Sequence, residues 1–331
     1  MAPAREEKNM EKDLAEKRCL SDNRRYADLI NGFVFRGRQI LHEKDLKEMD
    51  TQTGIWGRRR YWKKRKARPK YRDLLRKAAL GVNFAVIGVE NQEEVNYLMP
   101  LRSMGYDVGE YERQAAWAKK KVKKEKGISK AEFLSGFKKS DRLCPCITLV
   151  LFFGKEWDGG RDLHGILDFT DIPPELKEMV SNYPLHLLEV RKLERTDIFR
   201  TDLRQIFDII RYSENKEMLR KTIESDSAYR EMDEDAYDMA VEYVKAEELT
   251  AVKKFYQKEG KVDMCKALKE LIEDGKKEGR EEGEAKILVK SVESVMEKFH
   301  VDFETACDGV GITANEYYKA KAISKLFQKI G

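Results

Sequence analysis

The residues best suited to chemistry are Asp73, Glu90 and Gln92, three oxygen-bearing side chains that a β-hairpin would bring together. The predicted turn is the Gly-Val-Asn of residues 81–83, because glycine and asparagine both tolerate left-handed backbone angles. Folding the chain symmetrically about Gly81-Val82 places Asp73 opposite Glu90, with their Cβ atoms about 5 Å apart on one face of the sheet. Side chains alternate along a strand, so Gln92 is expected on the same face as Glu90.

Two carboxylates this close repel each other unless a proton or a cation lies between them. A hard divalent cation suits such a pair, since Mg²⁺ is commonly held by one or two carboxylates together with a substrate phosphate. The spacing therefore predicts a Mg²⁺ or Mn²⁺ site formed by Asp73 and Glu90. The alternative is a surface hairpin whose acids are simply hydrated, and the spacing alone does not decide between the two.

Apolar patterning predicts the elements that position these residues. Residues 84–89 form a short apolar run typical of a buried strand, and residues 144–153 form a longer one that would be buried on both faces. Between them, Pro100 suits the first turn of a helix. This helix is expected to pack on the sheet through an apolar stripe, namely Leu101, Met104, Val108, Tyr111 and Ala115.

Short motifs along the chain resemble those of a known nuclease family. Around the hairpin they are Tyr71-Arg72-Asp73-Leu74-Leu75, Val89-Glu90-Asn91-Gln92, Met99-Pro100-Leu101-Arg102 and Tyr106-Asp107. Elsewhere they are Tyr26-Ala27-Asp28-Leu29-Ile30-Asn31, Leu46-Lys47-Glu48-Met49-Asp50, Phe133-Leu134-Ser135-Gly136, Trp157-Asp158-Gly159 and Leu163-His164. In order and spacing, over about residues 20–290, they resemble the Rpn family of recombination-promoting nucleases, often described as transposases, within the PD-(D/E)XK superfamily.

This resemblance implies an α/β fold with a restriction-endonuclease-like core, in which helices flank a mixed central sheet, followed by a helical C-terminal region. It implies that Asp73 and Glu90 are metal ligands on the second and third core strands, together with the backbone carbonyl of Asn91. Gln92 stands where the superfamily has a lysine. Because glutamine cannot carry that positive charge, the mechanism must depend more on the metal, with Gln92 orienting the attacking water.

Two further acids are secondary candidates for the catalytic site. Residues 22–35 have the apolar spacing of a helix, and the first helix of PD-(D/E)XK folds can contribute an acid near the metal, which makes Asp28 a candidate. A first strand is expected around residues 46–49, and Asp50 directly after it is a candidate third acid. The alternative for both is an ordinary charged position on a helix surface or a strand edge.

A dense basic run leads into Asp73. Residues 58–72 include ten basic residues and no acid, so the net charge of +5 for the whole chain conceals a net charge of −5 outside this run. Lysine and arginine bind phosphate, and aromatic rings stack on bases, so the run is expected to contact DNA. The predicted DNA contacts are Arg58, Arg59, Arg60, Trp62, Lys63, Lys64, Arg65, Lys66 and Arg72. The alternative is an insertion whose charge has no dedicated partner.

Composition restricts the class of protein. The chain has 331 residues and no run near the ~20 apolar residues that a membrane span needs, and its first residues lack the apolar centre of a signal peptide. Five irregularly spaced cysteines indicate a reducing, cytoplasmic setting. We expect a tail over residues 1–20, a nuclease-like domain over 21–215 and a helical region over 216–331.

The helical region contains Gly275, Gly279 and Gly283 at four-residue spacing, which predicts either a hinge or a self-association helix and hence a homodimer through this region. A second lysine-rich stretch, residues 119–130, is expected to be a solvated helix end, the alternative being an extension of the DNA surface. The sequence thus predicts a metal-dependent DNA endonuclease. The alternatives are a DNA-binding module without catalytic activity and a helical protein-interaction scaffold.

Overall fold

The computed structural model describes residues 2–49, 52–53, 70–71, 73–80, 83–244 and 247–327. Asp50, the nine predicted DNA-contact residues between 58 and 72, and the predicted turn at 81–82 lie outside the described residues, so predictions that rest on them stay predictions. Among the helices in these ranges, none combines the length and the apolar character that a membrane span requires.

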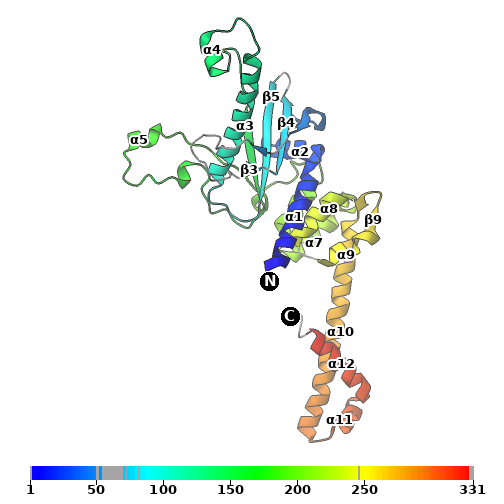
Figure 1. Ribbon diagram of the computed structural model, residues 1–331. Helices are drawn as coiled ribbons and strands as arrows, with labels where there is room; N and C mark the ends of the chain where they lie inside the picture. Colours follow the sequence, from blue (N-terminus) through cyan, green and yellow to red (C-terminus); the bar gives the residue numbers. More distant parts are fainter. Residues whose placement is uncertain are drawn as a thin grey trace.

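A five-stranded mixed sheet forms the centre of the molecule (Figure 1). Its strands, in spatial order, are β1 (Leu46–Glu48), β4 (Leu74–Leu80), β5 (Asn83–Gln92), β6 (Cys146–Phe152) and β7 (His186–Glu189). Strand β4 is antiparallel to β1 and β5, whereas β6 is parallel to β5 and β7. With its flanking helices, this sheet confirms the predicted α/β architecture, while the assignment to the PD-(D/E)XK class stays a prediction.

The pairing of β4 with β5 is the one predicted from the sequence. Leu74 pairs with Val89, and every later pair in the ladder keeps the same offset. Asp73 immediately precedes Leu74 in the chain, so it lies opposite Glu90 where the ladder ends. The hairpin therefore brings the two acids to the same end of the sheet.

A buried arginine in the middle of β4 holds this register. The guanidinium of Arg76 donates hydrogen bonds to the main-chain oxygen of Ser21 and to Oδ1 of Asn23, both at 3.1 Å. It also lies over the ring of Tyr26, 5.4 Å from the centroid. Because these partners belong to the helices on one side of the sheet, Arg76 is committed to that side.

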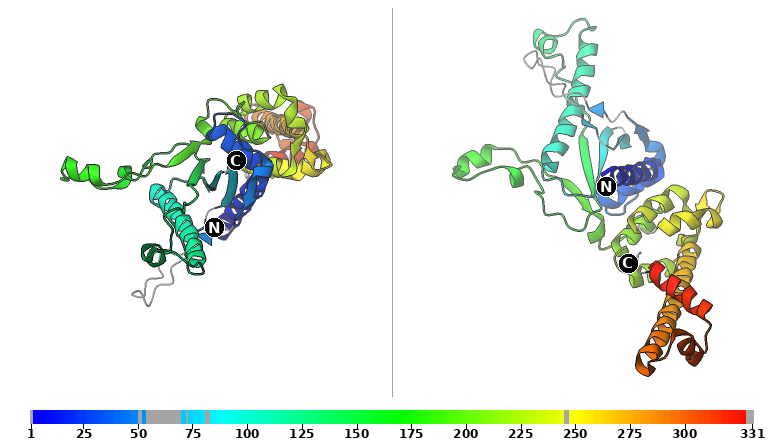
Figure 2. Two further views of the ribbon diagram at one scale, coloured as in Figure 1. Left: turned by 90° about the horizontal axis from the view of Figure 1, so that it is seen from above. Right: turned by 60° about the horizontal axis from the view of Figure 1, so that its bottom comes forward.

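Helices cover both sides of the sheet (Figure 2). One side carries α1 (Ala2–Ser21), α2 (Asn23–Phe33), α6 (Leu203–Tyr212) and α8 (Glu234–Val244). The other side carries α3 (Met99–Val122), which connects the parallel strands β5 and β6. Alternate residues of β4 enter the two cores, with Leu74 and Ala78 on the α1 side and Leu75 on the α3 side.

The helix predicted after Pro100 is confirmed as α3, but its predicted buried stripe is only partly right. Leu101 and Ala115 are exposed, whereas Met104, Val108 and Tyr111 are half-buried and Tyr111 packs against the core. The buried positions of α3 are instead Met99, Pro100, Ser103, Tyr106, Asp107, Gly109, Glu110 and Val122. Some of these buried polar side chains have partners, as Asp107 does by accepting a 2.7 Å hydrogen bond from Thr148 Oγ1 on β6.

The segment expected to be a tail is instead a helix. Residues 2–21 form α1, whose second half packs against α2, α8 and the sheet, and both Cys19 and Leu20 are fully buried. The helix also buries Lys12 and Glu16. Because both residues are polar, the buried side of the helix does not show as an apolar stripe in the sequence. Consequently α1 belongs to the core and lies beside the candidate site.

The helical C-terminal region is confirmed. Its helices are α7 (Lys216–Ser225), α8, α9 (Glu247–Tyr256), α10 (Met264–Phe299), α11 (Phe303–Val310) and α12 (Ala314–Phe327). Gly275, Gly279 and Gly283 lie inside α10, which runs through them without a break and carries α11 and α12 away from the sheet (Figure 1). A Cβ atom at any of the three would meet nothing within 4 Å. Self-association through this region stays a prediction.

Short elements complete the fold. They are η1 (Glu43–Asp45), β2 (Gln52–Thr53), β3 (Lys70–Tyr71), α4 (Lys130–Ser135), η2 (His164–Ile166), α5 (Pro174–Met179), η3 (Val190–Lys192), η4 (Ser227–Arg230), β8 (Met232–Asp233), β9 (Gln257–Lys258) and β10 (Lys261–Val262). Helix α5 lies on an arm that projects from the body between β6 and β7 (Figure 1).

Candidate functional site

Asp73 lies where β4 begins and is bonded across the hairpin. Its Oδ2 accepts a 2.8 Å hydrogen bond from the main-chain N–H of Asn91. This bond continues the β4–β5 contact one step past the pair of Leu74 with Val89. The carboxylate is thereby held at the open end of the β4–β5 hairpin, as the sequence predicts. We call this end, where Asp73, Glu90 and Gln92 lie, the hairpin mouth.

Glu90 is almost completely buried, with 3% of its surface exposed. Its Oε1 accepts hydrogen bonds from Arg102 Nη2 at 2.6 Å and from Tyr106 OH at 3.2 Å, both on the first turns of α3. Burial, together with the negative charge of Glu90, raises the pKa of Tyr106 to about 12, so the phenol remains a donor at neutral pH. A charged and a neutral donor from α3 therefore orient this carboxylate.

Gln92 lies beside Glu90, as the alternation of the strand predicts. Its Nε2 donates to the main-chain oxygen of Asn91 at 2.7 Å and to Oε1 of Glu90 at 3.4 Å. The Asn91 carbonyl thus belongs to the same cluster as Glu90 and Gln92. The Asn91 side chain is buried, and its two polar atoms have no hydrogen-bond partner among the described residues.

The structure adds a cation that sequence analysis missed. Lys17 of α1 places Nζ 3.2 Å from Oδ1 of Asp73 and 2.7 Å from Asp13. Burial alone would lower the pKa of Lys17, but its interactions with the two aspartates outweigh burial and raise it. No motif signals this contact, because 56 residues separate Lys17 from Asp73 in the chain (73 − 17).

A second polar group on α1 lies close to the same end of the sheet. Glu16, with 6% of its surface exposed, accepts a 2.5 Å hydrogen bond from the hydroxyl of Tyr243 on α8. Lys12 Nζ lies 3.8 Å from the centroid of the same tyrosine ring and 2.7 Å from Glu93. Burial raises the pKa of Glu16 to about 7, against the opposing effects of Tyr243 and Lys12.

This raised pKa predicts a specific dependence of stability on pH. The ordinary pKa of a glutamate is 4.5, so between pH 4.5 and about 7 the folded protein keeps a proton that the unfolded chain has lost. The free energy of unfolding contributed by Glu16 therefore falls as pH rises through this window. Glu16→Gln mimics the protonated form. The free energy of unfolding of this variant minus that of the wild type is therefore expected to increase by about 3 kcal/mol as the pH rises from 4.5 to about 7.

Urea unfolding followed by circular dichroism over this pH range measures the difference. Tyr243→Phe is the control, because it removes the hydrogen bond while leaving the carboxyl group to titrate. If the stability of Glu16→Gln runs parallel to that of the wild type at all these pH values, Glu16 does not titrate in this range.

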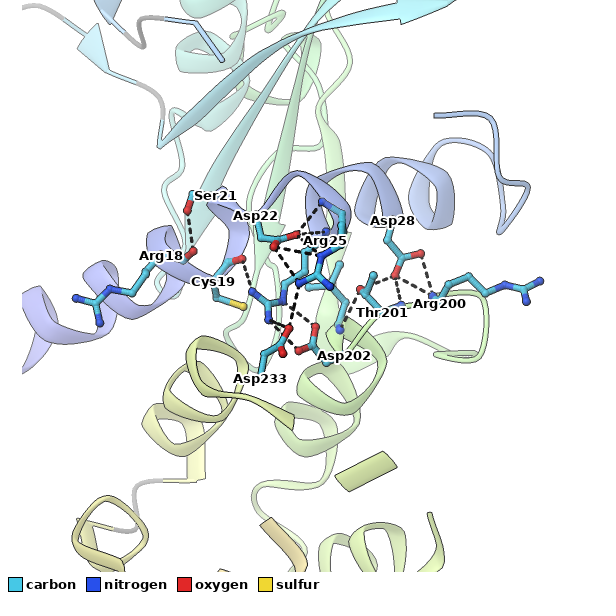
Figure 3. Close-up of polar contacts among 12 residues, drawn as sticks. Arg18, Cys19, Ser21, Asp22, Arg25, Asp28, Arg200, Thr201, Asp202 and Asp233 are labelled. Carbon is cyan, nitrogen blue, oxygen red and sulfur yellow. Dashed lines mark hydrogen bonds and ion pairs between the residues drawn. The ribbon is translucent and has the colours of Figure 1, made fainter. Parts of the chain in front are cut away.

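Asp28, the secondary candidate on the first predicted helix, has a different role (Figure 3). Its carboxylate accepts hydrogen bonds from the main-chain N–H groups of Arg200 and Thr201 at 2.7–2.9 Å and from Thr201 Oγ1 at 2.7 Å. These bonds fix α2 to the segment that leads into α6. The structure thus does not bring Asp28 to Asp73 and Glu90, and we assign it to the framework.

The donor set at the hairpin mouth suits a hard cation. Among the described residues, no group of three or more His, Cys, Asp and Glu side chains is arranged to hold a metal ion. The site offers two carboxylates, Asp73 and Glu90, and the carbonyl oxygen of Asn91. Magnesium accepts such an incomplete oxygen set because it keeps water and takes up substrate phosphate oxygens. The ion pairs of Asp73 with Lys17 and of Glu90 with Arg102 would compete with the cation.

Comparison with known proteins adds no relative, because no family model, no curated protein and no solved structure matches the chain. The resemblance to the recombination-promoting nucleases therefore rests on the sequence motifs.

Proposed function

We propose that this protein is a Mg²⁺-dependent nuclease that hydrolyses phosphodiester bonds in DNA, similar to the Rpn family of recombination-promoting nucleases. The observation that carries this proposal is the register of the β4–β5 ladder, which puts Asp73 opposite Glu90 at its end, with Gln92 bonded to Glu90. Two carboxylates, a carbonyl oxygen and a side-chain amide form the oxygen-rich site that phosphoryl chemistry with Mg²⁺ requires.

The order of the strands supports the same proposal. In a PD-(D/E)XK core, the family resemblance places the first acid on the second strand and the (D/E)-x-K motif on the third. Strands β1, β4 and β5 are neighbours in that order, with Asp73 at the start of β4 and Glu90 and Gln92 at the end of β5. The helix α3 then leads to β6, which lies parallel to β5.

Each residue has a defined task in the proposed reaction. Asp73, Glu90 and the Asn91 carbonyl would hold the ion, and Gln92 would accept and donate hydrogen bonds to orient the attacking water. When bound, Mg²⁺ polarises the phosphate and lowers the pKa of a coordinated water. Arg102 orients Glu90 in the free protein through its 2.6 Å bond.

We propose that another residue takes the role of the lysine that is missing from the (D/E)-x-K motif of this chain. Gln92 cannot supply a positive charge, but the ammonium group of Lys17 already lies 3.2 Å from Asp73. With Asp73 holding an ion, Lys17, which also pairs with Asp13, would be placed to stabilise the negative charge that develops on the phosphate or the leaving oxygen. In this chain, the first helix would thus contribute a cation where the superfamily uses the third strand.

Cleavage of supercoiled plasmid under a titration of MgCl₂ tests the proposal. We expect no nicking in EDTA and nicking that rises and saturates with Mg²⁺, because the water and the phosphate both require the ion. Lys17→Gln is expected to lower the saturated rate by about tenfold or more, the loss of one charge-stabilising contact. Lys221→Gln is the control, since it removes an exposed lysine from α7, away from the hairpin.

The ion pairs at the site favour one other candidate. Since Lys17 and Arg102 neutralise the two acids without a metal, a DNA-binding module that lacks turnover would be stable with the same geometry. DNA binding that is unchanged by EDTA, with no nicking at any Mg²⁺ concentration, would establish this second function and reject the first.

A further inference from the structure

A groove lies along the C-terminal half of α3, away from the hairpin mouth. It has a volume of about 540 Å³. Its lining includes Lys77, Arg113, Trp117, Lys121, Phe137 and Arg142. Val86 on its floor lies on the α3 side of β5, the side to which alternation also assigns Glu90. The groove and the hairpin mouth therefore open on the same side of the sheet.

An exposed tryptophan forms one wall of the groove. Trp117 has 63% of its surface exposed, and Nζ of Lys121 lies 4.0 Å from the centroid of its ring. A single exposed apolar side chain is common on protein surfaces. Here, however, a large flat ring stands at the edge of a hollow, with an ammonium group one helical turn away, and this combination suits a planar, negatively charged ligand.

The charge around the groove is positive, because five cationic and three acidic side chains line it. Its three acids already have partners within the protein. Glu110 is buried and lies 2.5 Å from Arg113, Glu125 pairs with Lys138 at 3.0 Å, and Asp141 accepts a bond from the Lys138 main chain. Residues 119–130 add seven lysines and one acid. This number exceeds the few cations that stabilise the end of a helix dipole.

We propose that this groove binds an unpaired nucleic-acid strand, with one base stacked on Trp117 and the phosphates contacting Lys121 and its neighbours. Aromatic platforms flanked by basic side chains are the general means of holding single strands without sequence preference. A purely acidic peptide would form ion pairs with the lysines but would not stack on the exposed Trp117 ring. An apolar partner would contact the ring but would not pair with the lysines.

The inference deepens the proposed nuclease function and rests on it for its link to cleavage. Arg102 at the hairpin mouth and Trp117 in the groove lie on the same helix, 15 residues apart (117 − 102), which is about 22 Å along the axis. A strand that enters the hairpin mouth thus has a binding surface beyond it on α3. The substrate would therefore include an unpaired segment next to the cleaved bond.

Fluorescence anisotropy with a labelled oligothymidylate, in EDTA so that nothing is cut, tests the groove directly. Trp117→Ala is expected to weaken binding about 5- to 100-fold, the usual range for the loss of one stacked base. Trp117→Phe should retain most of the affinity because the ring remains. Bound oligonucleotide should also quench the tryptophan emission that is lost in Trp117→Ala.

A matched control is present elsewhere in the chain. Phe255 on α9 is likewise an exposed ring, at 68%, with Nζ of Lys254 lying 5.1 Å from its centroid, but it is outside the groove. Phe255→Ala should leave the affinity unchanged. Equal losses in Phe255→Ala and Trp117→Ala would contradict a specific site.

Three results would overturn the inference: unchanged affinity in Trp117→Ala, equal dependence on Trp117 with a fully paired duplex, or equal quenching by polyglutamate. Failure of the nuclease proposal is separable from these results. In EDTA, Asp73→Asn should bind oligothymidylate at least as tightly as the wild type does, while it loses cleavage. Wild-type protein that binds the strand through Trp117 yet never cuts would reject only the nuclease, whereas Trp117→Ala that binds and cuts normally would reject only the groove.

Discussion

Asp73→Asn and Glu90→Gln are each expected to lower the rate of DNA cleavage by about a thousandfold or more, a loss of roughly 4 kcal/mol of transition-state stabilisation. Both variants keep the shape of the side chain but remove a negative charge from the proposed cation site. Since the two acids lie on different strands and have different partners, neither is expected to replace the other. Affinity for DNA measured in EDTA should stay equal or increase, because a charge that repels phosphate is removed.

Glu94→Gln is the matched control for these variants. It makes the same chemical change four residues beyond Glu90, at an exposed position. Its cleavage rate should equal that of the wild type, and thermal unfolding should show that all three variants are folded. Unchanged nicking by both Asp73→Asn and Glu90→Gln would defeat the nuclease proposal, whatever the metal dependence of the wild type.

Arg25→Met is expected to lower the free energy of unfolding by about 3–5 kcal/mol, which is the usual cost of breaking a buried ion pair. Arg25 is 2% exposed and bonds both oxygens of Asp202, at 2.7 and 2.9 Å, and Oδ2 of Asp233 at 2.7 Å (Figure 3). These contacts join α2 to the start of α6 and to β8. Without Arg25, Asp202 keeps a largely buried charge that has lost its bidentate partner.

The corresponding surface substitution provides the comparison. Arg195 is 70% exposed on its side chain and pairs with Asp197 at 2.7 Å, so Arg195→Met should change the stability far less than Arg25→Met does. Urea unfolding followed by circular dichroism measures both variants. Adding Asp202→Asn to Arg25→Met should recover part of the lost stability, because it removes the stranded charge. Equal costs in Arg25→Met and Arg195→Met would contradict the assigned role of the buried network.

The hairpin was predictable from the sequence because its determinants are local. A glycine-containing turn, an apolar run and the alternation of side chains were sufficient to predict the register that pairs Leu74 with Val89. Residues 146–152 were equally clear, since a short, continuous apolar run bounded by turn residues is typical of a strand buried on both faces. Local sequence thus predicted the register that puts Asp73 and Glu90 at the same end of the β4–β5 hairpin.

The surroundings of the acids were not predictable, because they depend on contacts between distant segments. Lys17 reaches Asp73 only after α1 packs against the sheet, and Glu16 meets Tyr243 of α8. The buried face of α3 was predicted only in part for a related reason. Its polar members, among them Tyr106 and Asp107, are stable in the interior only because partners on β5 and β6 receive them.

The register of β4 has a consequence for how activity is lost. A slip of one residue would turn Asp73 away from Glu90, but it would also swing Arg76 away from the carbonyl of Ser21 into the opposite core. The hairpin mouth and the interior therefore form together or not at all. A sample of a destabilised variant that retains part of the cleavage activity is then a mixture of active folded molecules and inactive unfolded molecules. The activity per folded molecule should therefore remain constant.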